Sequence, residues 1–171
     1  FSNDPVIKIL VPEKMSKLAK NMRRYGFGKH VDRFEFQMNR SAEVASAEAK
    51  SLFVDSISSM SIGDAWSILK GPDNAATQYF RQNTETKLRQ RFKPIISNSM
   101  GKVGFYSDYR KLLETYQSLP LVEKPNLDIE HYILQKTLDG LFLKVADEEM
   151  KIRRDPAARV TELLQRVFSN Q

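Results

Sequence analysis

Apolar side chains recur three and four residues apart along most of this chain, and this spacing constrains the fold more than any other feature. Such a period places them on one face of an α-helix, whereas a half-buried strand would need strict alternation. The clearest stretches are Val31, Phe34, Met38, Ala42 and Ala45, then Leu134, Leu138, Leu141, Phe142 and Val145, and finally Val160, Leu163, Leu164, Val167 and Phe168. The sequence therefore predicts an all-α fold, a single compact multi-helix domain of about eight or nine helices over residues 1–171.

Prolines mark the segments that depart from this pattern. Residues 6–11 lie between two prolines and are predicted to be extended, because a residue that precedes proline is disfavoured in the helical region. Residues 117–126 contain two further prolines and are predicted to form a flexible loop. Asp155 and Pro156 are predicted to end the helix near Arg154 and to cap and start the last one.

Residues 61–81 carry the signals of two short helices that meet at a tight corner. Ser61 and Asp64 have the spacing of a capping box, and the helix that follows is predicted to carry Trp66 into the core. Gly71 is predicted to end that helix in the left-handed conformation, and Asp73 to cap the next.

A basic helix is expected to begin or continue at Thr84, and Pro94 is predicted to end or kink it.

Composition excludes several chemistries. The chain has no cysteine, which rules out disulfides, thiolate metal ligands and cysteine nucleophiles. Its formal net charge of +6 would favour acidic partners, but no nucleic-acid-binding motif accompanies that charge, so a nucleic acid is not the expected partner. No apolar run approaches the length of a transmembrane helix. Because the chain opens at Phe1 instead of Met, we expect that a signal sequence has been removed.

The corner at residues 71–74 is a candidate anion site, because a helix N-terminus presents unpaired N–H groups. Asn74 belongs to the corner, and Thr77 and Arg81, four residues apart, would add a hydroxyl and a guanidinium on one helix face. In the alternative interpretation Asp73 only caps the helix, and Arg81 forms a surface ion pair or ties helices together.

Gly140 is the second candidate, because it lies inside a strongly apolar helix where glycine costs about 1 kcal/mol relative to alanine. Something in the fold must offset that cost. Either a second helix crosses closely at Gly140, or a ligand lies against the helix there. The candidate ligand-binding residues are thus Asn74, Thr77, Arg81 and Gly140.

The acidic run at 147–149 does not predict a metal site, because successive helical residues point in different directions and no histidine follows at ligand spacing. It is predicted to form a solvated acidic face, with pairs from Asp147 to Lys151 and from Glu149 to Arg153. The sequence predicts no metal and no cofactor.

No catalytic arrangement can be recognised, since His30 and His131 are isolated in the sequence. The chain is not expected to be an enzyme. Lys17, Lys20 and Arg24 share one helix face, which could contact anionic lipid or another polyanion.

Three blocks carry a family resemblance: GPDNAATQYFR at 71–81, QKTLDGLF at 135–142 and KIRRDPAAR at 151–159. Together they resemble a bacterial family that is known only as a domain of unknown function. Its members are compact helical proteins, commonly preceded by a signal peptide. The resemblance implies an exported protein, periplasmic or associated with the cell envelope, and it supplies no catalytic residues.

The sequence thus favours a non-catalytic helical binding protein of the bacterial cell envelope that recognises an anionic or amphipathic ligand or a protein partner. The alternatives are a hydrolase whose site assembles only in the fold, and a structural interaction protein. An apolar cavity near Gly140 with basic groups at its mouth would favour ligand binding, whereas carboxylates clustered with histidine would favour an enzyme.

Overall fold

The computed structural model of the chain describes residues 1–102, 105–117 and 128–155. In these ranges a short 3₁₀ turn, Glu13–Met15, and seven α-helices are present, with no strand. The helices are α1 (Ser16–Arg24), α2 (Gly28–Ser46), α3 (Ala49–Ser58), α4 (Ile62–Lys70), α5 (Ala75–Lys102), α6 (Phe105–Gln117) and α7 (Ile129–Arg154). The all-α class is confirmed.

The helix count was overestimated: the described part of the chain has fewer α-helices than the eight or nine predicted. Of the two alternatives left open at Thr84, a new helix or a continuing one, the structure has the continuing helix α5. The predicted last helix lies outside the described residues. The predicted loop at 117–126 begins on the final residue of α6 and otherwise also lies outside them.

The contacts of the chain group it into two compact units, each built from two stretches. Unit 1 comprises residues 1–49 and 88–140, and unit 2 comprises residues 50–87 and 141–171. Helices α5 and α7 each contribute residues to both units. That these units make up a single domain stays a prediction.

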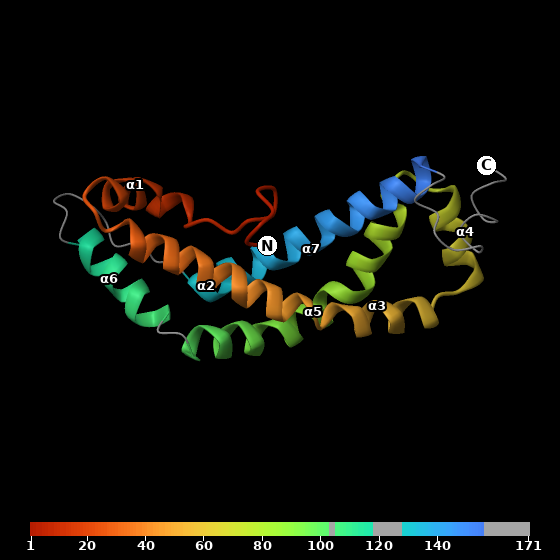
Figure 1. The fold of residues 1–171 in the computed structure, drawn as a ribbon. Coiled ribbons are helices and arrows are strands. Elements are labelled where there is room, and N and C mark those ends of the chain that lie inside the picture. The colour runs from red at the N-terminus through yellow and green to blue at the C-terminus, as the bar shows by residue number, and fades with distance from the viewer. Residues whose placement is uncertain (103–104, 118–127, 156–171) are drawn as a thin grey trace. The chain divides into compact units, whose positions relative to one another are not determined.

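Unit 1 is organised around α2, which packs against both α1 and α6 (Figure 1). The buried face of α2 carries the residues predicted from their spacing, Val31, Phe34, Met38, Ala42 and Ala45. Further buried side chains come from α5 and α7, namely Leu88, Phe92, Ile96, Met100, Ile133 and Leu138. The ring of Phe34 stacks on Tyr109 of α6 with a centroid distance of 5.9 Å. Helical periodicity thus identified this core correctly.

Residues 6–11 form no strand, and Val6 and Ile7 of the predicted extended segment lie in a turn. The amide of Lys8 donates to the carbonyl of Asp4 at 2.9 Å, which closes a turn. Beyond it, the amide of Ile9 donates to Oδ1 of Asn39, and Nδ2 of Asn39 donates to the Ile9 carbonyl, both at 2.8 Å. A buried side chain of α2 therefore satisfies the backbone groups that a partner strand would otherwise pair.

Unit 2 contains α3 from Lys50 onward, α4, the first part of α5 and the last part of α7. The rings of Phe53 and Phe80 lie 5.2 Å apart, and the ring of Phe142 lies 6.3 Å from Phe53. The predicted capping box is confirmed: Ser61 Oγ accepts from the amide of Asp64 at 3.1 Å, and the Asp64 carboxylate accepts from the Ser61 amide at 3.0 Å.

The prediction that Trp66 enters the core is wrong, because Trp66 is 55% exposed. The partly buried side of α4 contains Ile68 and Leu69, and Trp66 lies about 200° around the helix from Ile68. The ammonium of Lys70 lies 5.2 Å from the centre of the indole ring.

The left-handed stop predicted at Gly71 is also wrong, since this residue has φ −81° and ψ −179°. Glycine is needed there for space: a Cβ atom would lie 2.7 Å from both the Cβ of Ala75 and the carbonyl oxygen of Ser67. The close turn between α4 and α5 leaves no room for a side chain.

Pro94 does not end α5, which continues through it to Lys102. Pro94 is exposed, so water can take the place of the lost backbone donor. Thr84 also lies inside α5, and its hydroxyl donates to the carbonyl of Phe80 at 2.6 Å. Thr84 therefore continues the helix instead of starting one.

Candidate functional site

The first turn of α5 binds a carboxylate that belongs to the chain itself. The amides of Ala76 and Thr77 donate to Oε1 and Oε2 of Glu149 at 2.8 Å each, and the Thr77 hydroxyl donates to Oε2 at 2.7 Å. Glu149 lies on α7 and is only 8% exposed. The helix N-terminus that was predicted to bind an anion therefore already binds the carboxylate of Glu149.

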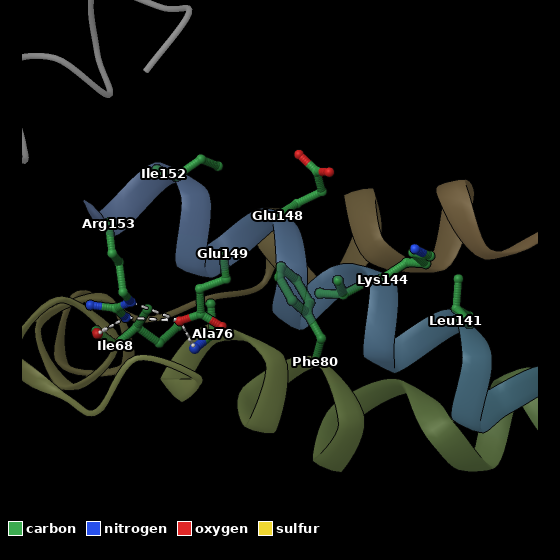
Figure 2. A pocket seen from close by; sticks show the side chains of 10 residues that line it. Ile68, Ala76, Phe80, Leu141, Lys144, Glu148, Glu149, Ile152 and Arg153 are labelled. Carbon is green, nitrogen blue, oxygen red and sulfur yellow. Dashed lines mark hydrogen bonds and ion pairs between the residues drawn. The ribbon is translucent and has the colours of Figure 1, made fainter. Parts of the chain in front are cut away.

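Arg153 extends this network to the end of α4. Its guanidinium donates to Oε1 of Glu149 at 3.0 Å from Nε and 2.9 Å from Nη2, and to the carbonyl of Ile68 at 2.7 Å. Both side chains of the ion pair are more than nine-tenths buried. Figure 2 shows the two side chains directed toward the start of α5 and the end of α4, while Glu148 points away from them. An acid at one helix N-terminus and a base at another helix C-terminus complement both helix dipoles.

The prediction of a solvated acidic face at 147–149 is therefore wrong for Glu149, although its pairing with Arg153 is confirmed. Lys151 pairs with Glu148 at 2.6 Å instead of with Asp147. A usable signal was present in the sequence, because position 149 follows Val145 by four residues and so continues the apolar stripe of α7.

The three residues predicted at the corner do not converge on one point. Thr77 is buried against Glu149, whereas Asn74 is exposed and its Oδ1 accepts from Gln78 Nε2 at 3.0 Å. Arg81 lies over the ring of Phe142 at 5.0 Å from the centroid, and its Nε donates to Glu85 at 3.0 Å. Binding of an external anion by these residues stays a prediction, and at Thr77 it would require Glu149 to leave.

Asp73 is not the cap that was predicted for α5. Its carboxylate accepts from Nε of Arg154 at 3.1 Å, while Glu149 takes the amides of the first turn. The physical reason is that α7 places the carboxylate of Glu149 at the N–H groups and the guanidinium of Arg154 at Asp73.

Gly140 lies in unit 1, where the N-terminal segment approaches it. A Cβ atom at this position would lie 2.7 Å from Cε1 of Phe1 and 3.2 Å from Cβ of Ile7. Close approach is thus the role of this glycine, but the neighbour is an irregular segment and not the crossing helix that was predicted.

An apolar pocket of about 450 Å³ lies next to the Glu149 network in unit 2. Its lining consists of Ile68, Ala76, Phe80, Leu141, Lys144, Val145, Glu148, Glu149, Ile152 and Arg153. The sticks in Figure 2 show that most of these side chains belong to successive turns of α7. Leu141, Lys144 and Arg153 are among the lining residues, whereas Gly140 is not, so a ligand at Gly140 stays a prediction.

One family model matches residues 1–169, almost the whole chain. The chain belongs to the family described as protein of unknown function (DUF4197). This assignment confirms the resemblance carried by the three sequence blocks. No curated protein and no solved structure significantly matches this DUF4197 chain. The family description names no reaction, so the function has to be argued from geometry.

The DUF4197 chain has a second polar cluster in unit 1, at the contact of α2 with α6. Arg33 donates to both carboxylate oxygens of Asp108, from Nε at 2.6 Å, and Nδ1 of His30 lies 3.5 Å from the same carboxylate. Burial acts to raise the pKa of Asp108, but the hydrogen bonds from Arg33 outweigh it and hold that pKa below its usual value. The arrangement is an ion pair between two helices, in which the carboxylate of Asp108 is buried and the guanidinium of Arg33 is more than half exposed.

His131 lies apart from this cluster. Its amide donates to Oδ1 of Asp128 at 2.9 Å, and it lines a pocket of about 300 Å³ together with two basic and two acidic residues, Arg89, Lys93, Asp128 and Glu130. Within residues 1–102, 105–117 and 128–155, no group of three or more histidine, aspartate or glutamate side chains is placed to hold a metal ion. In the same ranges, no helix of the DUF4197 chain combines the length and hydrophobicity needed to cross a membrane.

Proposed function

We propose that this protein is a non-catalytic binding protein whose pocket in unit 2 takes the apolar part of an amphipathic ligand. The observation that carries this proposal is the pocket of about 450 Å³, whose walls are formed mainly by Leu141, Val145, Ile152 and Phe80. Pockets for small ligands usually have about 300–1,000 Å³ and predominantly apolar walls with a few polar groups. A location in the cell envelope is part of the proposal and is supported by the family resemblance.

The charges around the pocket favour an amphipathic ligand over a polyanion. Each basic group in the lining is matched by an acid of the same chain: Arg153 pairs with Glu149 at 2.9 Å, and Lys144 pairs with Asp147 at 3.6 Å. A strongly anionic ligand would have to displace these partners or accept the repulsion of Glu148. A ligand with an apolar chain and one small head group would leave both ion pairs intact.

The cluster of His30, Arg33 and Asp108 gives little support to a hydrolase. His30 does lie beside the carboxylate of Asp108, but Arg33 occupies both oxygens of that carboxylate. In a catalytic triad the acid orients the histidine, and here it is instead committed to joining α2 and α6. We therefore propose no catalytic step.

The test is calorimetric titration of the full chain with dodecanoate, below its micelle concentration. Val145→Phe should fill part of the pocket and weaken dodecanoate binding at least about tenfold. The ligand would lose apolar contacts with the pocket wall, and a tenfold loss corresponds to about 1.4 kcal/mol. The matched control is Leu143→Phe, because Leu143 lies two residues away on α7 and is 41% exposed. It should bind as the wild type does. Equal binding by both variants, or no binding by the wild type, would contradict the proposal.

A second titration separates apolar from anionic recognition. Dodecyltrimethylammonium and dodecanoate share the alkyl chain and differ in the sign of the head group. The balanced charges around the pocket predict affinities within about fivefold of each other, which corresponds to about 1 kcal/mol. Binding of dodecanoate alone would point to an anion site in place of an amphipathic one.

A further inference from the structure

The turn between α1 and α2 in unit 1 presents two aromatic side chains to solvent. Tyr25 is 71% exposed and Phe27 is 57% exposed. Gly26 lies between them with a φ of 87°, in the left-handed region, just after the end of α1. Aromatic rings usually gain stability from burial, so two exposed rings at one turn mark a candidate contact surface.

Backbone hydrogen bonds hold this turn. The amide of Phe27 donates to the carbonyl of Met22 at 2.8 Å, and the amide of Gly26 donates to the carbonyl of Arg23 at 3.5 Å. These two bonds are the usual closure of a helix that ends on a left-handed glycine. The amide of His30 then donates to the Phe27 carbonyl at 3.1 Å where α2 begins. The two rings therefore stand on a hydrogen-bonded turn between two helices.

Positive charge without negative charge surrounds the turn in the sequence. Residues 14–29 contain six lysine and arginine residues and no aspartate or glutamate. One of the six, Arg23, pairs with Asp32 at 3.0 Å and with Glu35 at 2.9 Å. The other five are exposed and form no ion pair in the part of the chain that the structure describes, namely Lys14, Lys17, Lys20, Arg24 and Lys29. Their charge is available to an acidic partner outside the chain.

Three of these basic residues form a row on the exposed side of α1. The helix packs on α2 (Figure 1), and its buried residues are Leu18, Ala19 and Met22. Lys17, Lys20 and Arg24 recur three and four residues apart on the other side. The row extends about 10 Å at 1.5 Å per residue, which is close to the screening length at physiological salt. A flat anionic surface would therefore attract all three charges together, beside the aromatic turn.

We propose that the α1 surface, formed by Lys17, Lys20, Arg24, Tyr25 and Phe27, binds the surface of an anionic lipid bilayer. The basic row contacts the lipid head groups, and the two rings enter the boundary between head groups and acyl chains. The rings favour a bilayer over a nucleic acid, because the outside of a duplex offers charge, whereas a bilayer boundary also takes up aromatic side chains. The α1 surface belongs to unit 1, so this proposal does not depend on the pocket in unit 2.

Co-sedimentation of the full chain with lipid vesicles tests the basic row. We expect binding to vesicles of equal parts phosphatidylglycerol and phosphatidylcholine, and none to vesicles of phosphatidylcholine. One basic residue near an anionic surface strengthens binding about fivefold, so Lys17→Gln with Lys20→Gln should weaken it about twentyfold.

The matched control is Lys50→Gln with Lys87→Gln, which removes the same charge from two exposed positions of unit 2. It should bind the anionic vesicles as the wild type does. Equal losses in the two double variants, or equal binding to the two kinds of vesicle, would overturn the proposal. Circular dichroism confirms that each variant is folded.

Tryptophan fluorescence tests the aromatic turn, because Trp66 is the single tryptophan of the chain. Phe27→Trp combined with Trp66→Phe places one reporter at the turn, and its emission should shift to shorter wavelength when anionic vesicles are added. Tyr25→Ala should weaken vesicle binding several-fold, whereas Trp66→Ala, which removes an exposed ring from unit 2, should not.

A DNA duplex at equal phosphate concentration separates the two kinds of polyanion and should not displace the protein from the vesicles. Displacement would assign the α1 surface to nucleic acid and overturn the proposal. An unshifted emission of the reporter, or equal binding by Tyr25→Ala and the wild type, would overturn the role of the rings.

Discussion

Unit 1 and unit 2 are built from the same kind of helix but are held together differently. In unit 1, fully buried side chains such as Phe34, Phe92 and Leu138 form an apolar core. In the described part of unit 2, a buried ion pair between Glu149 and Arg153 joins three helix ends next to an apolar pocket. The comparison teaches that one chain can stabilise one group of helices with an apolar core and another with a buried ion pair, and that an apolar pocket lies beside the ion pair.

The largest expected effect comes from opening the core of unit 1. Phe34→Ala removes a fully buried ring and should lower the free energy of unfolding by about 3–5 kcal/mol. Trp66→Ala is the matched change in unit 2 and should lower it by less than about 1 kcal/mol, because more than half of that residue is already in water. Urea denaturation followed by circular dichroism measures both, and similar losses would break the contrast between the units.

Removal of the carboxylate in unit 2 should have the next largest effect. Glu149→Ala leaves Arg153 buried without its acid and frees the amides of Ala76 and Thr77, which should cost about 3 kcal/mol. Its neighbour provides the control, since Glu148 is exposed and Glu148→Ala should change stability by less than about 0.5 kcal/mol. Hydrogen exchange at the amides of Ala76 and Thr77 should accelerate only in the first variant. Unchanged exchange there would show that Glu149 does not cap α5.

Acid should loosen unit 1 at its N-terminal segment before its core is affected. Hydrogen bonds from the backbone amide and hydroxyl of Ser2, with help from Arg40, lower the pKa of Glu43 to about 2. Because folding lowers this pKa, ionised Glu43 stabilises the folded state. That stabilisation is complete above the unfolded pKa of about 4.3 and is lost as the pH falls toward 2. The amide of Ile9, which pairs with Asn39, should therefore lose protection between about pH 4 and pH 2. In Glu43→Gln this acid dependence should be absent.

The smallest expected effect concerns the exposed capping box of α4. Ser61→Ala should lower stability by about 1 kcal/mol, because the amide of Asp64 loses its acceptor. The same change raises the pKa of Asp64 toward its ordinary value, since the hydrogen bond from the Ser61 side chain is the main cause of its depression. Ser67→Ala, on the same helix but outside the cap, is the control for stability. Carbon-detected NMR titration of Asp64 measures this pKa in the wild type and in Ser61→Ala. An unchanged pKa would show that Ser61 does not cap α4.

The sequence predicted the buried face of α2 correctly, whereas on α7 Leu134, Leu138 and Phe142 are buried and Leu141 and Val145 line the pocket. The stripe from Val31 to Ala45 is buried as expected, and the capping box of Ser61 and Asp64 begins α4 at the predicted position. Trp66 was misplaced because α4 is short and its partly buried side runs through Ile68 and Leu69. Gly71 was assigned a left-handed conformation, whereas its role is to leave space for the carbonyl of Ser67.

The all-α class follows from the sequence alone, because helical periodicity and capping are local properties that neighbouring residues determine together. The candidate site depends on the tertiary structure. Glu149 lies 73 residues from Ala76 along the chain, and nothing local to either residue indicates that they meet. A helical period tells which side of a helix is buried, but the partner of a buried carboxylate is chosen only when distant helices pack and their N–H groups lose contact with water.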